Sequence, residues 1–180
     1  MKKFILSLLL IIGLSVPAEA VVVTGGNIGG YEFFVSPTIT IQNAAYVLGN
    51  CIGGIITVPV AITTGVTGLI NKFTFISNAG STVTKQIYVF TSNPSSSTCT
   101  DKSTFTIAAA DRPKLITSFP VTPVVPTGVT FSVAEVSGLT LPFTTSGNAN
   151  IYLMISEGGS ETPAATNDYI LNIMGVKEAQ

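Results

Sequence analysis

The amino-acid sequence predicts an all-β protein that folds as a single two-sheet sandwich of jelly-roll type, with about eight or nine strands. Residues that favour helix interiors, such as Glu, Lys, Gln and Arg, are rare, whereas Thr, Val and Ile are abundant. Ten prolines and seventeen glycines interrupt the chain at short intervals. Between these interruptions polar and apolar residues alternate, which is typical of strands with one buried face.

The strand pattern recurs along most of the chain. Residues 37–42 alternate Thr with Ile, and Pro59 predicts a bulge or a sheet edge within the segment 53–62. Residues 68–77 alternate most regularly, and a turn at 78–80 separates them from 82–91, so we expect these two strands to form a hairpin. The remaining strands are expected at 104–110, 114–119, 129–136, 151–156 and 168–176.

The N-terminus has the pattern of a signal peptide. Lys2 and Lys3 precede an apolar stretch at 4–16, and Ala18 and Ala20 supply the small residues that a signal peptidase reads. The stretch is shorter than the roughly 20 residues that span a bilayer, so we expect cleavage after Ala20 and no membrane span afterwards. A buried N-terminal helix is the alternative. The expected organisation is therefore a signal-like segment at 1–20, a Gly-rich leader at 21–36 and the β-sandwich domain at 37–180.

Charge and residue types exclude several function classes. Eight Lys and Arg residues against nine Asp and Glu residues form no basic stripe, so we expect no nucleic-acid partner. The chain has no histidine, which excludes Ser-His-Asp and Cys-His catalysis and the commonest zinc ligand. No Gly-rich phosphate loop is present either. We therefore expect no catalytic residue, no cofactor and no metal, and hence no enzyme.

Carboxylates are the remaining candidates for chemistry. Hydrolysis of a glycoside needs two facing carboxylates, and a calcium loop needs acids at close, regular spacing, which this chain lacks. Each candidate lies in a turn or near a loop, where a solvated acid is expected. The candidates are Asp101, Asp111, Glu135, Glu157, Glu161 and Asp168.

The chain has two cysteines. Cys51 lies in an apolar run and Cys99 in a polar stretch. In an oxidising compartment they could form a disulfide, which would stabilise the fold by roughly 4 kcal/mol in the chain-entropy model. The alternative is one buried thiol and one thiol in a loop.

Aromatic residues cluster at two places. Tyr31, Phe33 and Phe34 lie together in the leader and are the candidates for an exposed docking patch. Tyr88 and Phe90 share one face of an expected strand, which favours a place in the core. Because the chain has no Trp, a carbohydrate-binding platform is not favoured.

Several segments, in order and spacing, resemble a family of small β-sandwich virion proteins encoded by tailed phages. The resemblance covers about 135 residues between positions 37 and 176. It implies a structural role as a head decoration, fibre or other accessory protein, and it brings no catalytic residues. A signal-like leader departs from that family, whose members assemble in the host cytoplasm. The segments that carry the resemblance are 43–50 (NAAYVLGN), 52–54 (IGG), 68–89, 90–94 (FTSNP), 97–105, 111–116 (DRPKLI), 151–156 and 168–173 (DYILNI).

Two functions follow as expectations. The first is an accessory virion component that binds a capsid or fibre protein, either as a single copy or as a homo-oligomer. The second is an exported periplasmic or cell-surface binding module of a bacterium, which the signal-like segment and the possible disulfide favour. The localisation is accordingly either the virion or an exported fraction.

Overall fold

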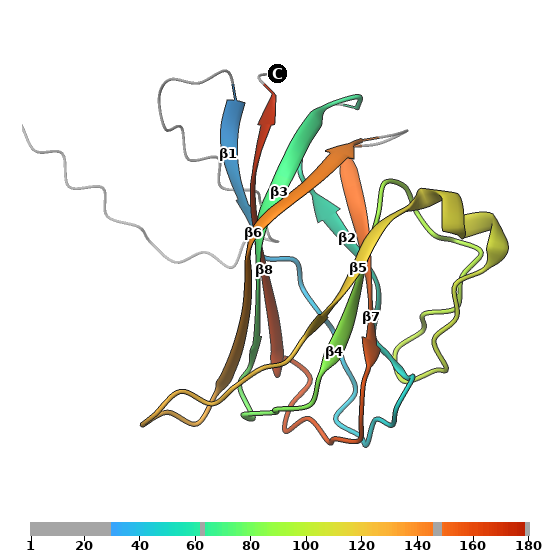
Figure 1. The fold of residues 1–180 in the computed structure, drawn as a ribbon. Coiled ribbons are helices and arrows are strands. Elements are labelled where there is room, and N and C mark those ends of the chain that lie inside the picture. Colours follow the sequence, from blue (N-terminus) through green and yellow to red (C-terminus); the bar gives the residue numbers. More distant parts are fainter. Residues whose placement is uncertain (1–29, 62–63, 146–148, 179–180) are drawn as a thin grey trace, which may run out of the picture.

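The computed structural model describes residues 30–61, 64–145 and 149–178, and in them eight strands form two antiparallel sheets (Figure 1). This confirms the predicted all-β, two-sheet fold. In the described residues the only helix is a short 3-10 helix, η1 (Ala109–Lys114). Sheet I contains, in spatial order, β1 (Gly30–Val35), β8 (Tyr169–Glu178), β3 (Thr67–Ser77) and β6 (Ser132–Thr144). Sheet II contains β2 (Cys51–Pro59), β7 (Asn150–Glu157), β4 (Lys85–Phe90) and β5 (Leu115–Val121).

The strand pairs are nested along the chain. β1 pairs with β8, β2 with β7, β3 with β6 and β4 with β5, while β3 also pairs with β8 and β4 with β7. As a result, every pair of consecutive strands except β4 and β5 is divided between the two sheets.

The predicted hairpin between 68–77 and 82–91 is therefore wrong. β3 lies in sheet I and β4 in sheet II, and residues 78–84 cross from one sheet to the other. The physical reason is the core. Phe73 and Phe75 of β3 and Ile87 and Val89 of β4 are fully buried in one apolar cluster, where the two sheets face each other. Each such side chain contributes about 1.5–3 kcal/mol by leaving water.

Three further segments differ from the expected strands. Residues 37–42 are not a strand, because the chain there crosses from β1 in sheet I to β2 in sheet II. Their alternation has another cause, since Ile39 and Ile41 are inserted in the core. The expected strand at 104–110 is reduced to isolated bridges at Thr104 and Thr106, and β6 continues to Thr144, beyond the expected 129–136.

The expected boundary of the domain is also corrected. Residues 30–35, placed in the Gly-rich leader, form β1 and pair with β8 along their whole length. The signal-like segment at 1–20 and the rest of the leader, 21–29, lie outside the described residues.

Candidate functional site

The β4–β5 loop (residues 91–108) covers the outer face of sheet II (Figure 1). Alternate residues of β7 show this, because Ile151 and Leu153 belong to the main core whereas Tyr152 and Met154 belong to a second apolar cluster. Phe105 of the loop stacks on Tyr88 of β4, with ring centroids 4.6 Å apart. The second cluster also includes Phe90, Cys51 and Cys99 as buried residues, and Ile55, Ile107 and Leu115 as partly buried ones.

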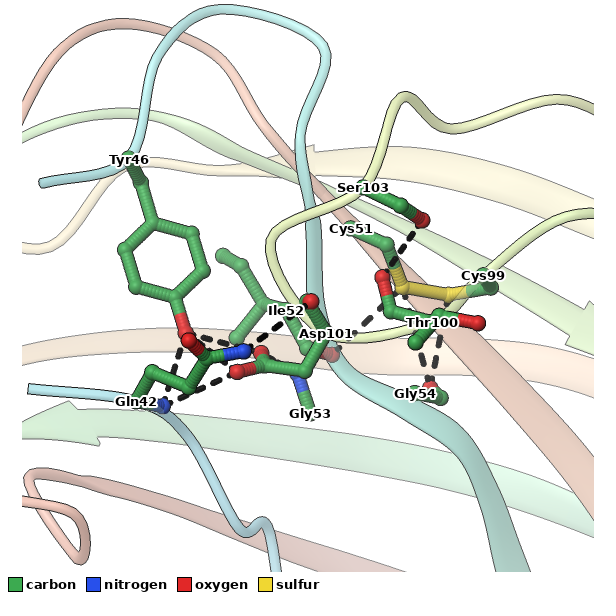
Figure 2. Close-up of a disulfide and its surroundings, with 10 residues drawn as sticks. All are labelled: Gln42, Tyr46, Cys51, Ile52, Gly53, Gly54, Cys99, Thr100, Asp101 and Ser103. Carbon is green, nitrogen blue, oxygen red and sulfur yellow. Dashed lines mark hydrogen bonds between the residues drawn. A yellow bond between two sulfur atoms is a disulfide. The ribbon is translucent and has the colours of Figure 1, made fainter. Parts of the chain in front are cut away.

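A disulfide between Cys51 and Cys99 holds this loop on the sheet (Figure 2). Cys51 is the first residue of β2, Cys99 lies in the loop, and their Cα atoms are 5.1 Å apart. The polar sequence around Cys99 is compatible with this pairing, because the Cys99 side chain itself is buried. Two backbone hydrogen bonds support the contact: Cys51 donates to the Ser103 carbonyl at 2.7 Å, and Lys102 donates to the Cys51 carbonyl at 2.8 Å.

Asp101 fastens the same loop to the crossing segment before β2 (Figure 2). Its carboxylate accepts hydrogen bonds from the Tyr46 hydroxyl, the Gln42 N–H and the Gly53 N–H, the last at 2.6 Å. Burial, together with the hydrogen bond to the Asp101 carboxylate, raises the pKa of Tyr46. The Tyr46 hydroxyl therefore stays protonated and keeps donating to Asp101 at any physiological pH.

A bulge in β2 brings the Gly53 N–H to Asp101. The register of β2 against β7 shifts between Ile52 and Ile56, and Gly53 has a φ of +70°, which favours glycine. A Cβ atom at Gly53 would lie only 2.5 Å from a methyl group of Ile39. Both the backbone conformation and the available space therefore require glycine at this position.

Asp111 holds the other end of the loop. Its carboxylate is fully buried and accepts hydrogen bonds from the Ser96 N–H, the Ser97 hydroxyl and the Lys114 ammonium, at 2.9, 2.7 and 2.6 Å. Burial alone would raise the pKa of Asp111, but the hydrogen bonds from Lys114 and Ser97 and the Lys114 charge lower it below the ordinary value.

A buried ionic cluster lies at the end of β4 and β7. The Lys85 side chain is fully buried, and its Nζ lies 3.1 Å from Glu157 Oε1 and 2.6 Å from Glu161 Oε1. The Val83 carbonyl accepts a further hydrogen bond from Nζ at 3.1 Å, and the ring of Tyr169 lies 5.5 Å from it. Because Glu161 belongs to the loop between β7 and β8, the cluster connects both sheets.

The cluster contains one lysine and two glutamates, so its charges do not balance. Glu157 Oε2 is buried and has no hydrogen-bond partner among the described residues. Burial raises the pKa of Glu157 to about 7, the negative charge of Glu161 adds to this rise, and the Lys85 charge opposes it. The raised pKa favours the protonated form of Glu157, which reduces the excess negative charge.

The expectation that the acids are solvated is corrected for most of them. Asp111, Glu157 and Asp168 are at most 2% exposed, and Asp101 and Glu161 are half-buried. Each accepts hydrogen bonds from backbone N–H groups, hydroxyls or lysine that close a loop. Only Glu135 is largely exposed, and it pairs with Lys72 at 2.7 Å.

The predicted docking patch is divided by the structure. Phe33 is wrong as a patch residue, because it is 2% exposed and packs edge-to-face on Phe143, with centroids 5.9 Å apart. Tyr31 and Phe34 are 38% and 37% exposed. The reason is the alternation of β1, which turns Phe33 inward and Phe34 outward. Of the two aromatics expected in the core, Phe90 is buried and Tyr88 partly buried.

Phe34 belongs to a larger surface that sequence reasoning missed, the outer face of sheet I, here called the open face. Phe34 lies opposite Met174 of β8, and Leu69 of β3 lies opposite Val176. Leu69 and Met174 are each 41% exposed. The open face comprises Glu32, Phe34, Leu69, Lys72, Thr74, Ile76, Val133, Glu135, Ile170, Asn172, Met174, Val176 and Glu178. A signal for it was present, because β8 has large apolar residues at both even and odd positions.

The described residues also form a hollow of about 240 Å³ beside the ionic cluster, lined in part by Ser81, Glu161 and Asp168. In that part of the chain no group of three or more His, Cys, Asp or Glu residues is placed to hold a metal ion, and no helix is long and apolar enough to cross a membrane. A hollow of about 610 Å³ lies at one end of the open face, lined mainly by apolar groups, among them Leu69, Phe143 and Val176.

The sequence was also compared with protein-family models, with curated proteins and with solved structures, and no match was found in any of the three comparisons.

Proposed function

We propose that this chain is a non-enzymatic structural protein, an accessory component of a phage-type virion that presents a protein-binding surface. The observation that carries the proposal is the difference between the two sheets. The outer face of sheet II is covered by its own disulfide-bonded loop, whereas the open face of sheet I carries exposed Phe34, Leu69 and Met174. Large apolar side chains exposed together on one face of a sheet are typical of a protein-interaction site.

The nested strand pairs support a jelly roll. In that fold an antiparallel ribbon, in which the first strand pairs with the last and the middle two pair with each other, is wrapped into two facing sheets. The pairs β1–β8, β2–β7, β3–β6 and β4–β5 fit such a ribbon. Jelly rolls serve as capsid and lectin domains, so the fold is compatible with a place in a particle.

The use of the acids supports a non-enzymatic role. A catalytic carboxylate needs a free oxygen that faces a cleft and its substrate. Here the carboxylates of Asp101 and Asp111 accept hydrogen bonds that hold the β4–β5 loop in place. The Asp168 carboxylate accepts a hydrogen bond from the Ala79 N–H at 2.6 Å, in the turn after β3. Glu157 and Glu161 surround Lys85. These carboxylates stabilise loops and strands.

The signal-like segment favours the second candidate, an exported bacterial binding module. The disulfide forms in oxidising compartments, and the signal-like segment at 1–20 would deliver the chain to one. A released virion also meets oxidising conditions, so the disulfide is compatible with both functions.

The experiment that distinguishes them is intact-mass and N-terminal analysis of the native protein, from purified particles and from the exported fraction of the cells. The virion role predicts many copies of the chain in each particle. Absence from particles, together with a Val21 start in the exported fraction, would overturn it in favour of the exported module.

A further inference from the structure

The open face is broad enough for a stable interface. Four strands spaced about 4.8 Å apart make a sheet about 19 Å wide, and ten residues of β8 at about 3.4 Å each make it about 34 Å long. Because β1 has only six residues, the product, about 650 Å² per copy or about 1,300 Å² for two copies, is an upper bound. Stable protein interfaces bury about 1,200–2,000 Å² in total, so the whole face of each partner would be needed.

The charges of the open face fit a second copy of the same chain. Its two central charges, Lys72 and Glu135, neutralise each other at 2.7 Å, so the centre of the face does not select a strongly acidic or basic partner. Two exposed acids, Glu32 and Glu178, lie towards the end of the face near Gly30, with Glu32 in the same row as Val176 and Leu69. When two whole faces stack with their strands in opposite directions, the acidic end of each copy lies over the opposite end of its partner. The net charge of −1 also keeps long-range repulsion between copies small.

We propose that two copies of this chain associate through their open faces, with the sheets stacked about 10 Å apart in the manner of a sandwich. The inference deepens the proposed function, because it names the partner of the surface on which that function rests. Phe34, Leu69 and Met174 form the centre of the interface, and the Lys72–Glu135 ion pair lies beside them. The loop-covered side of each copy then faces outward.

The test is the oligomeric state of the full chain by sedimentation velocity and light scattering across the micromolar range. We expect a mass of twice 18.7 kDa. The double variant Leu69→Glu/Met174→Glu places two charges at the centre of the interface and should weaken dimerisation by roughly 100-fold or more. The control is Leu48→Glu, a residue that is 73% exposed and lies outside the open face, and it should leave the dimer unchanged.

A second measurement needs no variant. The Lys72 amine should become less reactive towards an acetylating reagent as the wild-type protein concentration rises, whereas exposed Lys102 should react equally at all concentrations. A single-copy mass at high-micromolar concentration would overturn the proposal. So would a dimer that the double variant does not weaken, or a monomer whose Lys72 is protected at every concentration, which would indicate cover by its own residues 21–29. A monomer that is abundant in particles would overturn the dimer alone and leave the proposed function intact.

Discussion

Replacing Lys85 with Met tests the buried ionic cluster. Methionine keeps most of the length of the side chain but removes the charge that faces Glu157 and Glu161. The two carboxyl groups then remain buried without their cation. Breaking a buried ion pair in this way costs about 3–5 kcal/mol, which is a large part of the roughly 5–15 kcal/mol that stabilises a typical domain.

The loss should depend on pH in a stated direction. In the wild-type protein the pKa of Glu157 is raised to about 7 from 4.5, so the folded state holds its proton more tightly than the unfolded state. The corresponding stability is fully present below the unfolded pKa and is lost as the pH rises through the folded pKa. Without Lys85 the pKa of Glu157 rises further. The variant should therefore be weakest at alkaline pH and recover as Glu157 becomes protonated.

Urea unfolding at about pH 5 and about pH 8 measures this effect through the midpoint and slope of each transition. The control is Lys102→Met, which removes an exposed lysine and should change the free energy of unfolding by no more than about 0.5 kcal/mol. A loss below about 1 kcal/mol at the higher pH, the range of a surface ion pair, would refute the reasoning. An equal loss at both pH values would show that packing, rather than charge, is the cause.

Three further predictions concern the loops. Reduction of the Cys51–Cys99 disulfide should lower the free energy of unfolding by about 4 kcal/mol, and an unchanged urea midpoint under reductant would contradict it. Gly53→Ala should lower the melting temperature more than Gly128→Ala. Both glycines have positive φ, but only a Cβ atom at Gly53 would contact another side chain, so equal shifts would leave backbone strain as the sole cause. Asp111, whose pKa is lowered, contributes stability above its unfolded pKa that is lost as the pH falls through the folded pKa. Asp111→Asn should therefore make the free energy of unfolding fall less steeply as the pH is lowered. An unchanged dependence at acid pH would show that another group causes it.

The sequence alone determined the fold class and most of the strands. Alternation with period two is a local property of the chain, so Phe73 and Phe75 could be assigned to one face of a strand without knowing what they touch. The prolines and glycines that interrupt the chain marked the strand ends because their backbone preferences are local as well.

The partners of those strands depend on contacts between distant residues. Nothing near residues 78–80 distinguishes a hairpin from a crossing between sheets, and the choice is made by the core that β3 and β4 share. Likewise the polar sequence around Cys99 did not indicate that its side chain is buried, because the residues that bury Cys99 belong to sheet II.

The environment of the acids and the exposure of the open face also depend on contacts between distant residues. Asp101 and Asp111 belong to polar, turn-like sequence, and only the fold brings them to the backbone N–H groups and the lysine that bury them. The exposure of Phe34 and Met174 depends on which sheet has a covering loop. Residue types and their period are properties of the local chain, and they specify the strands. Burial, pairing and exposure arise from the free energy of contacts across the whole molecule, so they follow only once the two sheets are packed together.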